Sequence, residues 1–188
     1  MDIIICVWLK EEVFMLIDLY GVLSHEGEVK RLAAPIEAES FVSKLGDFAF
    51  VKKQDIELAF TNVGGKKIEV ASHLDVTLDI PCDRCLTDVP WQISVDSTRT
   101  LNFGEESPDA DETLKDMPFI DGTEFDVEKY AYSEILENFP MKVLCKTDCK
   151  GICNVCGMNL NHGSCECDRQ VLDPRMSKIR DIFQQFNQ

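Results

Sequence analysis

One stretch decides the fold: Ile68-Glu-Val-Ala-Ser-His-Leu-Asp-Val-Thr-Leu-Asp-Ile80. Apolar side chains recur at every second position, interrupted only at Ser72, and most of the positions between them are polar or charged. Successive side chains of a β-strand point to opposite faces of a sheet, so this alternation predicts a long strand with one buried and one solvated face.

The chain turns back directly after this strand. Pro81-Cys-Asp-Arg-Cys85 follows at once, and the same alternation then resumes between Trp91 and Phe103. Two alternating runs separated by a short polar segment are typical of a β-hairpin. The sequence therefore predicts a hairpin whose tip carries a pair of cysteines.

Further strands are expected upstream of the hairpin. Ile56–Phe60 alternates in the same way, and Asn62-Val-Gly-Gly65 joins it to the long strand through glycines that tolerate the positive φ of a tight turn. Met15–Leu23 and Val29–Ile36 are weaker candidates. These segments predict an α+β protein, mainly antiparallel β, in which a sheet or a partly closed barrel is followed by helices and a cysteine-rich module.

Two helices are expected after the strands. Asp126 can cap a helix over about residues 126–139, with Val127, Ala131 and Ile135 on one stripe and Pro140 after its end. Near the C-terminus, Asp173-Pro174 is an N-cap followed by proline at the first helical position.

The expected organisation is a β-rich domain over residues 15–141 and a cysteine-rich zinc module with the last helix over residues 142–188. Residues 105–112 are too acidic to pack in a core and predict a loop within the first domain.

The charge of the chain is strongly negative and unevenly distributed. Its 188 residues carry a formal charge of -15. Residues 1–141 hold 12 Lys and Arg against 29 Asp and Glu, whereas residues 142–188 hold 7 against 5. An acidic body of this kind repels a phosphate backbone and attracts basic partners.

The N-terminal sequence indicates a reducing compartment. The apolar run Ile3–Leu9 is too short to span a bilayer, follows Asp2 in place of a basic segment, and has no small-residue cleavage site after it. A disulfide framework would need secretion into an oxidising compartment. We therefore expect a cytoplasmic protein with reduced thiols and no membrane association.

Eight of the nine cysteines form four close pairs, and three of these pairs crowd into one short stretch. Tetrahedral zinc in structural sites takes four ligands, and soft thiolates at such spacings are its typical donors. The sequence thus predicts two structural zinc ions held by Cys82, Cys85, Cys145, Cys149, Cys153, Cys156, Cys165 and Cys167. Cys6 lies outside this pattern.

Loop closure favours one partition of these ligands. Cys153 and Cys156 can meet Cys165 and Cys167 by closing a short loop, which leaves Cys82 and Cys85 with Cys145 and Cys149. The competing partition joins the Cys82 pair to the Cys153 pair. In a further variant, His162 replaces one thiolate.

The sequence gives no indication of an active site. Four-thiolate sites are closed, whereas zinc needs an open position to activate water. His25, His73 and His162 are scattered, and neither a phosphate loop nor a nucleophile elbow is present. We expect a protein that is not an enzyme and binds no small-molecule substrate.

Several motifs together resemble one family. They are Leu78-Asp-Ile-Pro-Cys-Asp-Arg-Cys-Leu86, Cys145-Lys-Thr-Asp-Cys-Lys-Gly-Ile-Cys-Asn-Val-Cys-Gly-Met-Asn-Leu-Asn161, Cys165-Glu-Cys167 and Asp173-Pro-Arg175. In this order they closely resemble the YceD family, the large ribosomal RNA subunit accumulation proteins. The resemblance begins near Met15, so residues 1–14 look like an extension beyond the usual start of the family.

The resemblance implies a non-enzymatic factor needed for accumulation of large-subunit ribosomal RNA. Combined with the charge, it suggests that the partner is a basic ribosomal protein or a large-subunit assembly intermediate, and that any association with ribosomal RNA is indirect. Two other functions fit the residues. The cysteine-rich module could bind RNA directly through its lysines and arginines, or the thiols could form a zinc-dependent or redox-responsive interaction switch.

Overall fold

The computed structural model describes residues 15–104 and 117–167. The expected N-terminal extension, the acidic loop and the C-terminal helix lie outside these residues. The chain forms two compact units. The sheet unit comprises residues 1–80 and 89–141, and the cysteine unit comprises residues 81–88 and 142–188.

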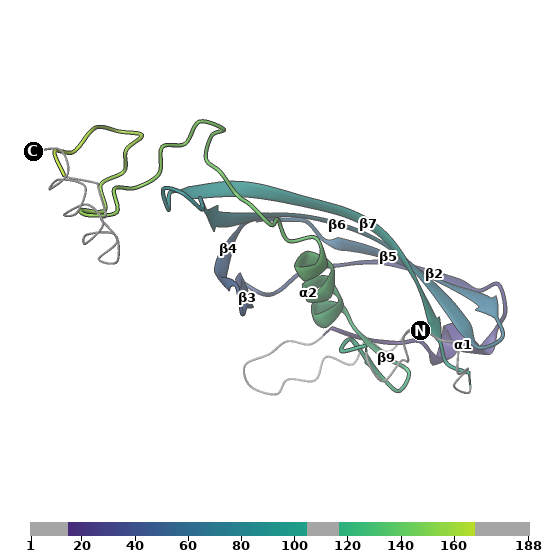
Figure 1. Cartoon of the computed structure of the whole chain (residues 1–188). Coiled ribbons are helices and arrows are strands. Elements are labelled where there is room, and N and C mark those ends of the chain that lie inside the picture. The colour runs from purple at the N-terminus through teal and green to yellow at the C-terminus, as the bar shows by residue number, and fades with distance from the viewer. Residues whose placement is uncertain (1–14, 105–116, 168–188) are drawn as a thin grey trace, which may run out of the picture. The chain divides into compact units, whose positions relative to one another are not determined.

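Two long strands form the framework of the sheet unit (Figure 1). β6 (Lys67–Pro81) and β7 (Asp88–Asn102) each have 15 residues and pair with each other, which confirms the predicted hairpin. The first half of β6 pairs antiparallel with β5 (Ile56–Gly64), and β5 pairs antiparallel with β2 (Val29–Ala34). The second half of β6 pairs with β4 (Gly46–Lys53), which pairs with β3 (Ser40–Ser43).

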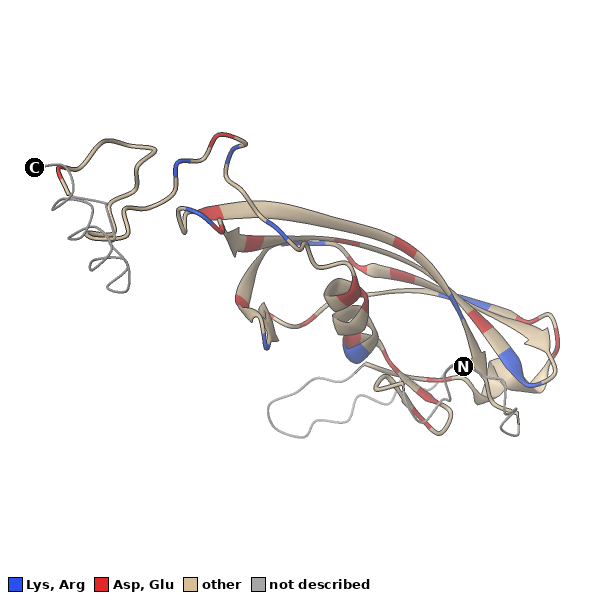
Figure 2. Cartoon of the chain, viewed as in Figure 1, with Lys and Arg blue, Asp and Glu red and all other residues tan. Residues whose placement is uncertain are grey.

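The alternation in β6 separates the two faces of this sheet as predicted. Ile68, Val70, Leu74, Val76 and Leu78 are completely buried on the inner face. The intervening side chains, many of them acidic, face outward, and acidic positions recur along β6 and β7 (Figure 2). The inner face supplies most of the apolar surface that drives folding of this unit.

Helix α2 (Val127–Glu137) crosses the inner face of the sheet (Figure 1). Asp126 caps it as predicted, because its Oδ1 accepts a hydrogen bond from the Lys129 amide at 3.0 Å. Tyr130 is fully buried and shares hydrogen bonds with Ser72 of β6 and Ser97 of β7. The helix is thus fixed to both long strands through one hydroxyl group.

A small second sheet lies beside the helix start. It consists of β1 (Leu16–Asp18), β9 (Glu124–Asp126) and β8 (Ile120–Asp121), in that order. Phe125 of β9 packs edge-on against Phe60 of β5, with ring centroids 5.0 Å apart. This contact joins the small sheet to the core of the large one.

Two features of the fold differ from what the sequence predicted. The predicted strand Met15–Leu23 is only three residues long in the structure, because the Asp18 side chain accepts a hydrogen bond from the Tyr20 amide and the chain turns into helix α1 (Tyr20–Ser24). The β3–β4 hairpin was not predicted, and a register shift after Phe50 interrupts its pairing with β6. Within the described residues the strands form two antiparallel sheets and no closed barrel.

Neither of the two helices in the described part of the chain is long and apolar enough to cross a membrane.

Candidate metal centres

The first tetrad consists of Cys82, Cys85, Cys145 and Cys149, and all of it lies in the cysteine unit. Its four sulfur atoms lie within 4.8 Å of one another. The Sγ atoms of Cys82 and Cys149 are 3.9 Å apart, and those of Cys85 and Cys145 are 3.5 Å apart. A tetrahedral zinc ion with bonds of about 2.3 Å to sulfur would separate its ligands by about 3.8 Å, so these residues fit the ion.

The second tetrad consists of Cys153, Cys156, Cys165 and Cys167, whose sulfur atoms also lie within 4.8 Å of one another. All eight cysteines of the two tetrads are free thiols. The structure therefore groups the sulfur atoms as loop closure favours, and His162 belongs to neither tetrad. Each tetrad could hold a metal ion.

Both tetrads are built on the same kind of turn. The Leu86 amide donates to the Cys82 carbonyl at 2.9 Å, and the Gly157 amide donates to the Cys153 carbonyl at 2.8 Å. In the same way, the Cys82 amide donates to the Thr87 carbonyl and the Cys153 amide to the Met158 carbonyl, both at 2.9 Å. The two CxxC segments are thus equivalent knuckles that hold a pair of sulfurs on one side of a tight loop.

The residue after each knuckle has a left-handed backbone, with φ of 59° at Leu86 and 72° at Gly157. Glycine adopts this conformation freely, whereas a residue with a side chain is strained there by about 1–2 kcal/mol. Leu86 is also 64% exposed, so burial of its side chain does not compensate for the strain.

We therefore expect Leu86→Gly to stabilise the cysteine unit by roughly 0.5–1 kcal/mol, after allowance for the greater flexibility of glycine in the unfolded chain. Thermal unfolding of the cysteine unit in the presence of zinc, followed by NMR, would measure this gain. Gly157→Ala is the matched control and should be destabilising, because an added Cβ meets no atom within 4 Å and only the backbone conformation is affected. A less stable Leu86→Gly variant would contradict the interpretation.

Each tetrad contains at least one thiol with a lowered pKa, and in the first tetrad hydrogen bonding with Thr87 also lowers the pKa of Cys85. Burial opposes ionisation of Cys82, but hydrogen bonds from the amides of Cys145, Arg84 and Cys85 outweigh it and lower its pKa to about 6. Amides of Cys156 and Val155 similarly lower the pKa of Cys153 to about 6. Thiolate is the form that binds zinc, so each knuckle offers a preformed ligand to a cation.

Each tetrad also contains a thiol that stays protonated in the absence of a cation. The side chain of Cys85 raises the pKa of Cys145 to about 12, and that of Cys156 raises the pKa of Cys167 to about 12. Crowded sulfur atoms disfavour a second negative charge in the absence of a cation. The same crowding favours a divalent ion that neutralises them.

Two asparagines near the first tetrad were not recognised as functional from the sequence. The side-chain amide of Asn161 donates to the Cys149 sulfur at 3.3 Å, and that of Asn159 donates to the Thr87 hydroxyl at 3.2 Å. Both belong to the stretch Gly157-Met-Asn-Leu-Asn161 that follows the second knuckle. The sequence signal that could have identified the two asparagines is the position of this stretch directly after a knuckle.

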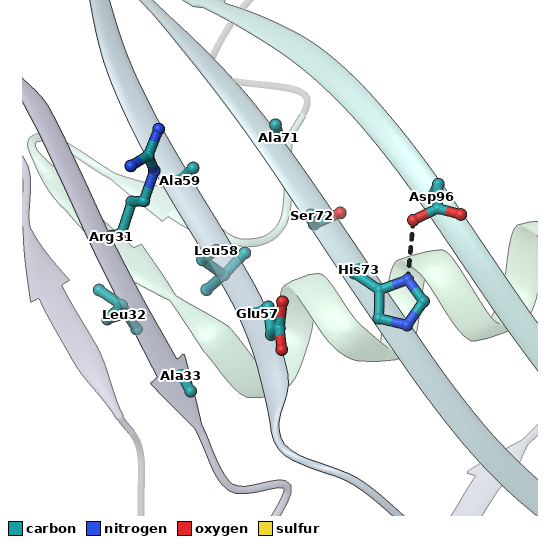
Figure 3. Close-up of a pocket in the computed structure, with 10 residues that line it drawn as sticks. All are labelled: Arg31, Leu32, Ala33, Glu57, Leu58, Ala59, Ala71, Ser72, His73 and Asp96. Atoms are coloured by element: carbon teal, nitrogen blue, oxygen red, sulfur yellow. Dashed lines mark hydrogen bonds and ion pairs between the residues drawn. The ribbon is translucent and has the colours of Figure 1, made fainter.

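A separate shallow pocket of about 530 Å³ lies on the large sheet (Figure 3). Its lining comes from β2, β5, β6 and β7 and includes an ion pair in which His73 Nδ1 lies 2.7 Å from an Asp96 carboxylate oxygen. This hydrogen bond raises the pKa of His73 above its usual value. Ser72 also lines the pocket, but its hydroxyl bonds to Tyr130 and Ser97. His73 therefore pairs with a carboxylate and does not activate the Ser72 hydroxyl.

Comparison with known proteins identifies two relatives. A chloroplast protein of Arabidopsis thaliana, named large ribosomal RNA subunit accumulation protein YCED homolog 1, is 29% identical over 65 residues, which are 35% of this chain and 20% of the relative. The protein YlbN of Bacillus subtilis, whose function is uncharacterised, is 26% identical over 125 residues, which are 66% of this chain and 71% of that protein. The chain thus spans only a fifth of the chloroplast relative. No solved structure gives a significant match.

A family model covers more of the sequence. The model described as large ribosomal RNA subunit accumulation protein YceD matches residues 70–183, which is more than half of the chain. The matched segment starts within β6 and includes both knuckles and both tetrads. The resemblance inferred from the motifs is confirmed, and the chain belongs to the YceD family of large ribosomal RNA subunit accumulation proteins.

Proposed function

We propose that this chain is a non-enzymatic, cytoplasmic factor in ribosome biogenesis that supports accumulation of large-subunit ribosomal RNA. In this proposal it binds a basic ribosomal protein or an assembly intermediate of the large subunit, and two structural zinc ions hold its cysteine unit together. Membership of the YceD family supports the general role. The single observation that carries the rest is the contrast between an acidic sheet unit and a cysteine unit with two four-sulfur centres.

The charge of the sheet unit supports a basic protein partner. Outward-facing carboxylates follow one another along the two central strands, at Glu57 on β5 and at Glu69, Asp75 and Asp79 on β6 (Figure 2). Such a face attracts a cationic partner over a distance of about a Debye length and repels bare nucleic acid. Ribosomal RNA would then be reached through the bound protein.

The donor set of each tetrad supports zinc. Four thiolates at tetrahedral spacing suit zinc, and they leave no position on the ion for a reacting water molecule. The ions would therefore organise the chain and take no part in a reaction.

Direct RNA binding by the cysteine unit is less well supported. Residues 81–88 and 142–167 contain four basic and four acidic residues, without counting the negative charge of any thiolate. The same residues contain no phenylalanine, tyrosine or tryptophan on which a base could stack. A thiol switch remains a second candidate because the Cys82 and Cys153 thiols ionise readily.

A salt-graded pull-down with the zinc-loaded full chain tests the proposal. We expect the captured material to contain basic ribosomal protein, to survive ribonuclease, and to be released as salt is raised, because charge attraction is screened. RNA that remains bound after the proteins have been stripped would contradict it and favour direct RNA binding. Binding that disappears after mild oxidation, with loss of zinc, would favour the switch.

Two sets of substitutions locate the attraction. Replacing Glu57, Glu69 and Asp79 with Gln, Gln and Asn should weaken capture. Replacing Glu26, Asp47 and Asp55 with Gln, Asn and Asn makes the same change in net charge at residues that are exposed elsewhere in the sheet unit. This second set should weaken capture less than the first. Equal effects of the two sets would show that net charge alone, and no particular face, attracts the partner.

A further inference from the structure

The loop of the second tetrad supplies a hydrogen bond to one ligand of the first and a hydrogen bond to a neighbour of another. Asn161 lies between Cys156 and Cys165, yet its side-chain amide donates to the Cys149 sulfur at 3.3 Å. In the same loop, the Asn159 amide donates to the Thr87 hydroxyl, whose oxygen is 3.3 Å from the Cys85 sulfur. The loop that closes one centre therefore contacts one sulfur of the other directly and a second sulfur through Thr87.

The orientation of Asn161 is fixed by its own contacts. Its Oδ1 accepts from the Lys150 amide at 3.0 Å, so the nitrogen of the side chain must point to the opposite side. Both hydrogens of that nitrogen are used, one on the Cys149 sulfur and one on Asn159 Oδ1 at 2.9 Å. Asn159 Oδ1 also accepts from the Asn161 backbone amide at 3.0 Å. The two asparagines act as one rigid group.

The backbone of the loop depends on closure of the second tetrad. The Cys153 amide donates to the Met158 carbonyl within the knuckle, and the Leu160 amide donates to the Gly151 carbonyl, both at 2.9 Å. Ile152 and Asn159 form an antiparallel bridge between the two sides of the loop. An ion bound to the second tetrad would hold these strands together and so hold both asparagines in place.

The first knuckle in turn contacts the segment that leads into the second knuckle. The carbonyl of Arg84, which lies between Cys82 and Cys85, accepts from the Ile152 amide at 3.0 Å, and its guanidinium donates to the Cys149 carbonyl at 2.9 Å. An added Cβ at Gly151 would lie 3.0 Å from that same Arg84 carbonyl oxygen. The two knuckles are therefore packed backbone against backbone.

We propose that the two centres bind zinc cooperatively, and that Asn161, supported by Asn159, is the positioning residue that couples them. The proposal rests on the zinc occupancy put forward above. Four thiolates around a divalent ion carry a net charge of -2, and a donor on one sulfur stabilises that charge. Loss of such an outer hydrogen bond typically lowers metal affinity about 10–100-fold. Linkage then requires each centre to favour occupancy of the other by the same factor.

The test measures zinc affinity of each centre separately in the full chain by chelator competition, with cobalt absorption as a second readout of thiolate coordination. A Cys153→Ser/Cys156→Ser chain retains only the first centre, and a Cys82→Ser/Cys85→Ser chain retains only the second, so the two binding steps can be assigned. We expect the first centre to bind zinc about 10–100-fold more weakly when the second is removed. Asn161→Ala should lower the zinc affinity of the first centre by a similar factor. In the chain that already lacks the second centre, the same substitution should cause little further loss of affinity.

Asn154→Ala, at an exposed asparagine between Cys153 and Cys156, is the matched control and should leave the first centre unchanged. Wild-type affinity of the first centre in Asn161→Ala, or a first centre that binds zinc equally well with and without the second, would overturn the coupling and leave zinc binding itself intact. Absence of zinc binding to the unaltered chain would instead overturn the proposed occupancy, so the two failures can be told apart.

Discussion

Cys156→Ser is expected to unfold the second loop of the cysteine unit while the sheet unit keeps its fold. In residues 81–88 and 142–167, Val143 is the one buried apolar side chain that is not a cysteine. Burial of one valine contributes about 1.5–3 kcal/mol, far less than the entropy lost by ordering these residues. A structural zinc ion contributes about 10–16 kcal/mol to such modules. Loss of one of its four ligands should therefore abolish the ordered state.

NMR and zinc analysis would check this prediction. The amide signals of residues 153–167 should collapse to unfolded positions and at least one zinc ion should be lost, whereas the signals of β5 and β6 should remain. Cys6→Ser, at the cysteine outside the four close pairs of the sequence, is the control and should retain two ions. A Cys156→Ser chain that holds two ions with dispersed signals would show that the Cys156 sulfur is not a ligand.

Arg99→Ala is expected to lower the free energy of unfolding of the sheet unit by about 3 kcal/mol. Arg99 lies on the inner side of β7, and its Nε donates to a Glu134 carboxylate oxygen on α2 at 2.7 Å. The Glu134 side chain is only 1% exposed, so removal of the guanidinium would leave a buried carboxylate without its countercharge. The loss also removes one of the polar contacts between the helix and β7, while the hydrogen bond between Tyr130 and Ser97 remains.

Urea unfolding followed by a probe in the sheet unit would measure this loss. Arg99 also pairs with Glu137, whose side chain is 55% exposed. Glu137→Gln is therefore the matched control and should cost less than about 1 kcal/mol, because exposed ion pairs contribute little. Equal effects of Arg99→Ala and Glu137→Gln would refute the importance of the buried carboxylate.

Strands and helices with regular periodicity were predictable from the sequence. The alternation around Leu74 identified β6, and Asp126 identified the start of α2 by the capping chemistry that the structure shows. The short elements were not predictable in the same way. β1 ends where the Asp18 carboxylate turns the chain, and β8 has two residues, which is too few for any period to be visible.

The sequence by itself determined the kind of chemistry: eight paired thiols suited to a soft cation, an alternating strand with an acidic face, and an ordered set of motifs that belongs to one family. These are local properties, because spacing along the chain sets which pairs of sulfurs can share a turn. Tertiary structure alone decided the strain at Leu86 and the reach of Asn161 to Cys149. The strain arises within the turn from Cys82 to Thr87, where the sequence has leucine and no glycine to indicate a left-handed backbone. The reach of Asn161 depends on how distant backbone segments pack against each other, and no local pattern of residue types encodes that packing.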